Sequence, residues 1–402
     1  MKTIAVIGGG AAGLMAAYTA AQNPEHQVVL LERQARVGRK LMATGNGRCN
    51  LSNRNAAVEH YHGENPNFVR PALERFSVSD TLALFRQLGL LTVEAEEGRF
   101  YPLSDSANSV LDVLRFALER ENVRLMAGAP VTAVKRRKGG FSITVGEETV
   151  AADEVIVACG GCAGSKLGGV SDGYTLLQSL GHTRTALHPA LTQMISDSPY
   201  PRSLKGVRAP AKIRLERKGK LIAENGGEVQ FTEKGISGIA VFELSRLVST
   251  GGPCRAVLDF LPEYSREEIL VLLKNRRRDC PGLPSEEVLT GAVHNKLGRV
   301  LCRAAEITGT TAGELTDGQL SACAALCKQF PLNITGTGGF DSAQVTAGGI
   351  VTAEFNPHTM ESRKVLGLYA CGEVLDIDGD CGGYNLQWAW SSGRLAGELN
   401  HD

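Results

Sequence analysis

The sequence predicts an α/β protein in which a parallel β-sheet is interrupted by a large insertion. Three observations predict this fold class. Residues 1–33 read as strand, glycine-rich turn, helix and strand. Two later apolar runs, 153–158 and 367–371, read as further buried strands. Between about 191 and 342 the pattern changes to strand-like alternation and then to capped helices. The 402 residues are enough for two or three domains with cores of their own.

The N-terminal segment has the order that a dinucleotide-binding fingerprint requires. The strand Ile4–Ile7 comes first. In the turn that follows, Gly8 allows a tight bend, Gly10 allows close approach of a pyrophosphate, and Gly13 lets the next helix pack against the strand. The N-terminus of that helix presents N–H groups to the phosphates. Glu32 ends the second strand, where a carboxylate can accept both hydroxyls of an adenosine ribose. The prediction is a Rossmann-like domain.

Composition and charge exclude several classes of function. The formal net charge is zero, so no global field would recruit nucleic acid or an anionic membrane. The short basic runs 135–138 and 276–278 are explained by a hairpin end and a helix C-terminus. No apolar stretch is long enough for a membrane span, and the N-terminus enters a strand instead of a signal peptide. We expect a cytoplasmic protein with a small-molecule substrate and neither nucleic acid nor membrane as partner. The oligomeric state stays open.

The ten cysteines fit reduced thiols of a cytoplasmic protein. Cys159 and Cys162 have the C-x-x-C spacing of redox dithiols. However, the intervening Gly160 and Gly161 form a strand-to-turn doublet that suits backbone contact with a cofactor, and this is the interpretation we favour. No spacing of histidines, cysteines or acidic residues indicates a metal site.

Three further segments favour FAD over NAD as the dinucleotide. A glycine-rich, cationic loop at 34–50 suits a ligand that continues past its pyrophosphate. Residues 131–150 alternate as a three-stranded meander before the strand 153–158. The C-terminus places Gly372–Glu373 after a strand, and Gly382–Gln387 before a last helix whose N-terminus would face the pyrimidine end of a flavin. This layout is that of FAD-binding folds of the glutathione-reductase type.

The residues expected to bind the cofactor share these turns and helix starts. They are Gly8, Gly10, Ala11, Ala12, Gly13, Glu32, Arg33, Arg39, Lys40, Gly45, Gly47, Arg48, Cys49, Asn50, Val131, Gly160, Gly161, Gly372, Glu373, Gly383, Tyr384, Asn385 and Leu386.

Motifs along the whole chain resemble the signature of a bacterial flavoprotein family. The motifs are Gly38–Leu41, Thr44–Asn53, Phe231–Thr232, Gly235–Gly238, Val345–Gly349, Thr359–Ser362 and Gly383–Trp390. Members are catalogued as NAD(P)/FAD-dependent or "aminoacetone oxidase family" FAD-binding enzymes, and the family includes a 3-dehydro-bile acid reductase. The chain departs from the pattern at Ile239, where the family often has Pro, and at Cys159, where Thr is more usual.

The resemblance implies three parts, and the sequence supports the boundaries. These are an FAD-binding domain (1–190 and 343–402), an inserted β-barrel or meander (191–255 and 330–342) and a small helical domain (256–329). The runs 211–217, 220–222 and 228–231 are strand-like, and the capping boxes Ser265–Glu268 and Thr316–Gln319 begin helices.

The run Gly336–Gly339 is not followed by a helix, so we interpret it as a linker back to the FAD domain. The chain then has no second Rossmann unit. NAD(P)H, as a transient electron donor, would dock directly against the flavin and leave before the acceptor enters.

Four residues are candidates for the chemistry. Arg48 and Asn50 lie in the loop expected beneath the flavin, where they could stabilise an enolate-like charge, tether phosphates or cap the loop. His188, at the entry to the insertion, is a candidate proton donor, although a structural histidine is the simpler interpretation. Tyr384 could donate a proton through its hydroxyl or simply pack.

Three functions stay open. The first is NAD(P)H-driven, FAD-dependent reduction of a C=C bond conjugated to a carbonyl, as in a 3-oxo-enone steroid or bile acid, by hydride transfer from flavin N5. The second is a flavin oxidase of a small amine or another donor. The third is a non-catalytic flavin-bearing binding or RNA-associated protein, which would need a basic surface that the composition does not suggest.

Overall fold

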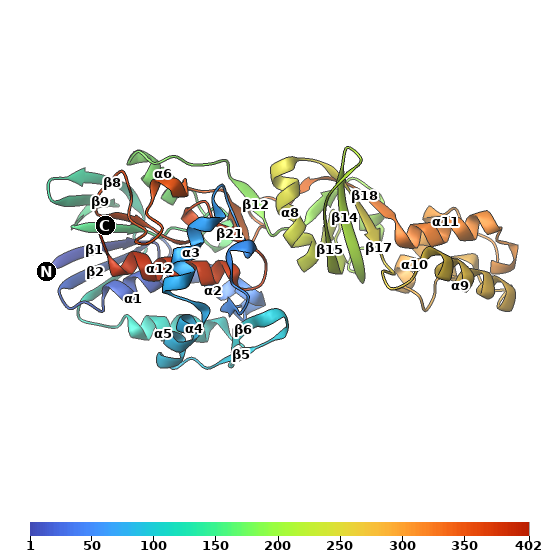
Figure 1. Cartoon of the computed structure of the whole chain (residues 1–402), viewed down its shortest axis with the longest axis horizontal. Coiled ribbons are helices and arrows are strands. Elements are labelled where there is room, and N and C mark those ends of the chain that lie inside the picture. The colour runs from blue at the N-terminus through green and yellow to red at the C-terminus, as the bar shows by residue number, and fades with distance from the viewer. Residues whose placement is uncertain (402) are drawn as a thin grey trace. The chain divides into compact units, whose positions relative to one another are not determined.

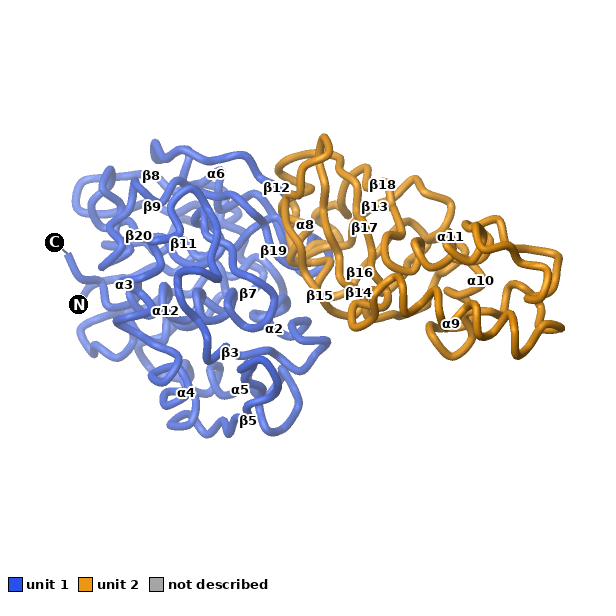
Figure 2. The backbone as a smooth tube through the Cα atoms, turned by 45° about the vertical axis from the view of Figure 1, so that its right-hand side comes forward, with its two compact units in different colours: residues 1–188, 344–402 blue, residues 189–343 orange. Residues whose placement is uncertain are grey.

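The computed structural model describes residues 1–401, which form two compact units (Figure 2). The first unit comprises residues 1–188 and 344–402, and the second comprises residues 189–343. Each unit has a hydrophobic core of its own.

The first unit is built on a five-stranded parallel sheet (Figure 1). In spatial order the strands are β20 (Leu368–Ala370), β11 (Glu154–Val157), β1 (Lys2–Ile7), β2 (His26–Glu32) and β7 (Val123–Ala127). All four neighbouring pairs are parallel. Residues 4–7 of β1 are buried without interruption, which is why this strand is apolar throughout instead of alternating. The predicted Rossmann-type α/β fold is confirmed.

Further elements surround this sheet. The helices are α1 (Ala11–Ala20), α2 (Arg39–Ala43), α3 (Arg70–Arg75), α4 (Val78–Gln87), α5 (Ala107–Ala117), α6 (Asp172–Ser179) and α12 (Tyr384–Glu398). The predicted meander is formed by β8 (Val131–Arg137), β9 (Gly140–Val145) and β10 (Glu148–Ala152), with the basic run at its first hairpin. The short strands are β3 (Ser52–Asn53), β4 (Tyr61–His62), β5 (Thr92–Glu94), β6 (Arg99–Pro102), β19 (Val345–Ala347) and β21 (Asp378–Gly379).

Two glycines of α12 allow this last helix to pack directly on α1. A Cβ atom at Gly393 would lie 2.5 Å from the carbonyl oxygen of Ala12, and one at Gly397 would lie 2.5 Å from that of Ala16. Any larger residue at either position would force the helices apart. The close contact brings the C-terminal segment to the helix that begins at the glycine-rich turn.

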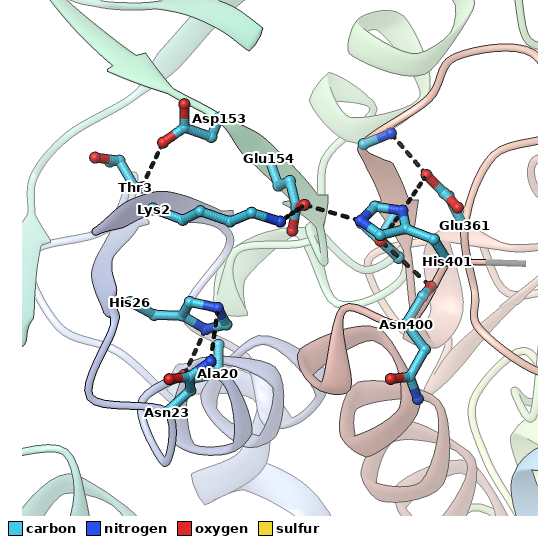
Figure 3. A network of polar contacts seen from close by, with 12 residues as sticks. Lys2, Thr3, Ala20, Asn23, His26, Asp153, Glu154, Glu361, Asn400 and His401 are labelled. Carbon is cyan, nitrogen blue, oxygen red and sulfur yellow. Dashed lines mark hydrogen bonds and ion pairs between the residues drawn. The ribbon is translucent and has the colours of Figure 1, made fainter. Parts of the chain in front are cut away.

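The two ends of the chain meet in a polar network at the edge of this unit (Figure 3). Lys2 Nζ and His401 Nε2 lie 2.9 and 3.2 Å from the same oxygen, Oε1 of the buried Glu154. The other ring nitrogen of His401 lies 3.2 Å from Oε1 of Glu361, which is also buried. The network fastens the residues that follow α12 to the sheet.

The second unit contains a closed barrel of six strands whose neighbours are all antiparallel. Around the barrel the strands are β13 (Met194–Ser196), β16 (Gly235–Ser237), β15 (Lys220–Phe231), β14 (Arg208–Arg217), β17 (Cys254–Asp259) and β18 (Phe330–Thr337). Ala211, Ile213 and Leu215 of β14 are buried and alternate with more exposed residues, as a barrel strand requires. The predicted inserted barrel is confirmed.

The helices of this unit are α7 (Tyr200–Ser203), α8 (Ile239–Gly251), α9 (Arg266–Asp279), α10 (Asn295–Ala304) and α11 (Asp317–Lys328), and β12 (His188–Ala190) spans the boundary between the units. Both predicted capping boxes are present: Ser265 caps α9 and Thr316 caps α11.

Three details of the insertion differ from the sequence-based expectation. The runs 220–222 and 228–231 belong to one strand, β15, because β14 pairs with it through the intervening glycines (Lys212 with Gly226, Ala211 with Gly227). Strand β17 continues to Asp259, so the boundary expected at 255 falls inside a barrel strand. Gly336 and Thr337 end β18, so the interpretation of this run as a linker was wrong for these two residues.

Candidate functional site

The turn between β1 and α1 has the geometry of a phosphate cradle. Gly8 has a φ of +109°, in the region that favours glycine. A Cβ atom at Gly13 would lie 1.8 Å from the carbonyl oxygen of Gly8, so only glycine fits there. A Cβ atom at Gly10 would meet no atom of the described chain within 4 Å, so this glycine faces open space at the start of α1. Ala11 and Ala12 follow it with the first N–H groups of the helix.

Glu32 is fixed at the end of β2. Its two carboxylate oxygens accept hydrogen bonds of 2.7 Å each from the backbone N–H groups of Gly9 and Gln34. The predicted cations near it have partners within the protein. Arg33 lies 3.7 Å from Asp172, and Arg39 donates to Gln34 Oε1 and to the carbonyl of Lys166.

A second cradle lies where β11 and β20 end. Lys40 Nζ lies 2.7 Å from Glu373 Oε2, while Glu373 Oε1 accepts the backbone N–H of Thr346 at 2.8 Å. A Cβ atom at Gly161 would lie 2.7 Å from Glu373 Oε1, whereas one at Gly160 would meet nothing within 4 Å. The predicted role of these glycines in close backbone approach therefore fits the geometry.

The loop before β3 has an unusual backbone. Within five residues, Gly45, Asn46, Gly47 and Cys49 all have φ between +57° and +87°. Such conformations carry strain in residues other than glycine and concentrate at functional sites. The Cys49 side chain is buried, and burial raises the pKa of its thiol to about 12. It is therefore a neutral packing group in this loop.

Asn50 carries the clearest sign of a ligand-binding role. Its Oδ1 atom is buried and has no hydrogen-bond partner within the described chain. A Cβ atom at Gly383, which precedes α12, would lie only 2.8 Å from this oxygen. An unsatisfied buried acceptor costs free energy unless a donor reaches it. The N–H of a flavin pyrimidine ring is a donor of the right kind.

These residues fit FAD. The open faces of Gly10 and Gly160 suit phosphates and ribitol, Glu32 suits the adenosine ribose, and the unpartnered Asn50 acceptor beside the N-terminus of α12 suits the flavin ring. Gly372, with φ +74°, packs on Ala12 and so ties the two cradles together. Val131 and Leu386 pack with the hydrophobic core of the unit.

The structure places the four predicted catalytic residues in different settings. Asn50 and Tyr384 lie near the N-terminus of α12. Arg48 is half-exposed, pairs with Asp105 and lies 4.4 Å from the centre of the Tyr101 ring. The hydrogen bond that Arg48 donates to Asp105 is the main reason that the pKa of Arg48 is raised. His188 is partly exposed in β12 and ends the first of the two segments that make up the first unit.

Sequence reasoning missed a histidine cluster beside Tyr384. His60 and His62 both contact the carboxylate of Asp380, at 2.9 and 2.7 Å. His60 ends a 3-10 turn (Val58–His60) and His62 lies in the strand β4 that follows, so the H-x-H spacing of the sequence was the local signal that could have drawn attention to them. Asp380 could not be found in this way because it lies more than 300 positions further along the chain.

Asn385 holds the turn that contains Asp380. Its side chain accepts from the N–H of Gly379 and donates to the carbonyl oxygens of Gly379 and Asp380. Asn385, predicted to bind the cofactor, thus uses its side chain to hold the backbone of the turn that precedes α12.

The C-x-x-C pair has no sign of thiolate chemistry. Both cysteines are free, and burial raises the pKa of Cys159 to about 12 and also raises the pKa of Cys162. A thiolate is the reactive form in disulfide exchange, so these environments oppose it.

Within residues 1–401, no group of three or more histidine, cysteine or acidic side chains is arranged to hold a metal ion. None of the helices in that part of the chain has the length and apolar character needed to cross a membrane.

Known proteins match this chain over almost its whole length. The HI0933-like protein Rossmann domain family matches residues 2–399. The 3-dehydro-bile acid delta(4,6)-reductase of Clostridium scindens is 42% identical over 404 residues, which cover 99% of this chain and 98% of that protein. The ribosomal RNA dihydrouridine synthase of Escherichia coli is 31% identical over 390 residues, 96% of this chain and 95% of that protein.

Among solved structures, 3-ketosteroid delta1-dehydrogenase from Sterolibacterium denitrificans is similar over 99% of both chains, with a TM-score of 0.54 and 12% identity, which shows a shared fold. The resemblance found in the motifs is confirmed. The chain belongs to the HI0933-like family, with a Rossmann domain of the FAD-binding type.

Proposed function

We propose that the protein is an FAD-dependent reductase of a carbon–carbon double bond conjugated to a carbonyl group. The observation that carries this proposal is the 42% identity, over nearly the whole of both chains, to a reductase of 3-dehydro-bile acid. When bound, FAD supplies the hydride for such a reaction. The substrate class we infer is a 3-oxo steroid or bile acid with ring unsaturation.

The second relative supports the same bond chemistry. Dihydrouridine is uridine in which the C5=C6 double bond, conjugated to the C4 carbonyl, has been reduced. The names of both relatives therefore describe the addition of two hydrogens to an unsaturated carbonyl system. This shared chemistry supports the reaction class independently of the particular substrate.

The residues of the site have distinct tasks in this proposal. The N–H groups at the start of α1 hold the pyrophosphate, and Glu32 holds the adenosine ribose. Glu373, oriented by Lys40, would hold the ribitol. The N-terminus of α12 and the Asn50 amide hold the pyrimidine ring, where the positive end of the helix dipole favours the negative charge that develops on reduction.

The charge of the inserted unit favours a small substrate over RNA. Residues 189–343 contain 20 basic and 17 acidic side chains. On the outside of the barrel, Arg208 pairs with Glu228, and Lys212 lies 2.9 Å from Glu224. Cations that are neutralised by neighbouring acids offer little attraction to a polyanion.

Product analysis tests the proposal. The FAD-loaded protein is supplied with NADH or NADPH without oxygen and offered either a 3-oxo-4,6-diene steroid or unmodified ribosomal RNA, and the products are weighed by mass spectrometry. The expected result is a steroid product heavier by two hydrogens and unchanged RNA. If dihydrouridine forms in the RNA and no reduced steroid is found, the substrate is RNA and not a steroid. If dithionite-reduced protein also leaves both substrates unchanged, the reductase function is wrong.

A further inference from the structure

The histidine cluster lies at the N-terminal end of α12 and has no task in the function proposed above. His60 Nδ1 contacts one oxygen of Asp380 at 2.9 Å, and His62 Nε2 contacts the other at 2.7 Å. The ring of His60 also stacks on the ring of Tyr384, with centroids 4.4 Å apart and an interplanar angle of 19°. The two imidazoles therefore share one carboxylate beside the first residue of the helix that receives the flavin.

Backbone contacts fix the cluster in place. Strand β4 pairs with β21, which puts Tyr61 opposite Gly379 and His62 opposite Asp378. The N–H of Asp380 donates to the carbonyl of His60 at 3.0 Å. The hydroxyl of Tyr61 donates to the carbonyl of Tyr384 at 3.0 Å. Because main-chain and side-chain contacts agree, the imidazoles are oriented before any substrate arrives.

The contacts also fix where the ring protons lie. A carboxylate accepts hydrogen bonds, so the ring nitrogen that faces Asp380 carries a hydrogen in each histidine. The second nitrogen of each ring, Nε2 of His60 and Nδ1 of His62, has no hydrogen-bond partner within residues 1–401. About a third of each side chain is exposed, 33% and 37%, so a ligand or water can reach it.

Asp380 remains a carboxylate in this setting. Burial opposes its ionisation, but the hydrogen bonds from His62 and His60 outweigh burial and lower the pKa of Asp380. An ionised carboxylate behind an imidazole orients the ring, as in histidine–aspartate pairs that transfer protons.

We propose that His62 is the proton donor of the reductase, with Asp380 and His60 as positioning residues. The stacking on Tyr384 holds His60 in a packing role, which leaves His62 as the freer imidazole. This inference rests on the proposed function. The β-carbon gains the hydride that bound, reduced FAD would supply, and the π electron pair of the C=C bond moves toward the carbonyl oxygen. One proton must then reach the substrate. It comes from Nδ1 of the His62 imidazolium, whose N–H electron pair stays on the ring, and water later returns the proton.

Separated half-reactions test this assignment. The FAD-loaded wild type, His62→Gln and the control His26→Gln are reduced without oxygen by dithionite and then mixed with a 3-oxo-4,6-diene steroid. The return of the oxidised flavin absorbance is followed. We expect His62→Gln to slow this step at least about 100-fold, in line with the loss of general acid catalysis. Reduction by dithionite and the Kd for FAD should stay within twofold of the wild type in both variants.

Two further measurements separate proton transfer from a structural role. Added imidazole should restore part of the lost rate in His62→Ala, as expected for a missing proton donor. In the apo-protein, ¹⁵N NMR of the His62 ring should show the hydrogen on Nε2, and Asp380→Asn should lose this preference.

The results that contradict the inference are equally specific. A His62→Gln reoxidation rate within threefold of the wild type, or the absence of imidazole rescue in a folded, FAD-loaded His62→Ala, would overturn the assignment of His62. A wild type that no conjugated carbonyl compound reoxidises would instead contradict the proposed function, and the assignment with it.

Discussion

Lys40 Nζ and Glu373 Oε2 lie 2.7 Å apart and join helix α2 to the turn after β20. The pair is partly buried, with 32% and 18% of the two side chains exposed. It orients the Glu373 carboxylate between the two halves of the predicted cofactor site.

Lys40→Met should weaken FAD binding about tenfold, or about 1.4 kcal/mol, because Glu373 would lose the partner that orients it. Fluorescence titration of apo-protein with FAD measures the Kd. Lys40→Arg is the control, since it keeps the charge, and should bind FAD more tightly than Lys40→Met. Equal Kd values for Lys40→Met and the wild type would contradict this role.

Gly10 and Gly13 offer a matched pair of substitutions in one turn. Gly10→Ala adds a methyl group into open space at a φ of −82°, which alanine tolerates, so the apo-protein should lose less than about 1 kcal/mol of stability. The same methyl group would block the phosphates and abolish FAD binding. Gly13→Ala should destabilise the apo-protein itself, because its Cβ atom would lie 1.8 Å from a carbonyl oxygen. Thermal unfolding and FAD titration of both variants check this. Normal FAD binding by Gly10→Ala would exclude the predicted pyrophosphate site.

Cys159 and Cys162 should not act as a redox pair. With a pKa of about 12 for Cys159, only about one thiol in ten thousand is ionised at pH 8. We expect Cys159→Ser to keep the wild-type rate of turnover. Iodoacetamide should label the exposed Cys280 far faster than Cys159 in the folded protein. Rapid labelling of Cys159, or loss of turnover in the serine variant, would contradict this expectation and support a redox dithiol.

Glu354 should make the stability of the first unit depend on acid pH. Burial would raise its pKa, but hydrogen bonds from Lys364, Thr183 and His182 lower it to about 2. An unfolded chain would titrate this carboxyl near pH 4.3. Because the folded-state pKa is the lower one, the stabilisation is complete above about pH 4.3 and is lost as pH falls toward 2.

The full contribution to the free energy of unfolding is about 3 kcal/mol, because the pKa of Glu354 differs by roughly two between the folded and the unfolded chain. Urea unfolding of the apo-protein and of Glu354→Gln between pH 6 and pH 3 measures it. The wild type should have the higher free energy of unfolding at pH 6, and its difference from the variant should shrink as the pH falls. A difference that stays constant over this range would show that hydrogen bonds do not lower the pKa of this carboxyl.

The sequence predicted those parts of the fold that depend on short-range patterns. Some features depend only on residues within a few positions of one another, and these could be predicted. They are the glycine-rich turn from Gly8 to Gly13, the buried strand β11 and the capping boxes at Ser265 and Thr316. The single strand β15 was not predicted, because Gly226 and Gly227 are typical of a turn. Only the pairing with β14 keeps them extended.

The candidate site shows the same limit. Asn50 was predicted from its loop, but the unpartnered oxygen that distinguishes it depends on the distant Gly383. The cluster of His60, His62 and Asp380 needs the pairing of β4 with β21, two strands of two residues each that carry almost no local signal. Both features are formed by contacts between segments far apart in sequence, and local sequence patterns do not predict such contacts.

The most direct test of the reductase function is an anaerobic visible spectrum of the FAD-loaded protein. NADH and then NADPH are added, followed by a 3-oxo-4,6-diene steroid. We predict that one nucleotide bleaches the flavin band and that the steroid restores it in proportion to the amount added. A band that the steroid does not restore, even after complete reduction by dithionite, would contradict the account.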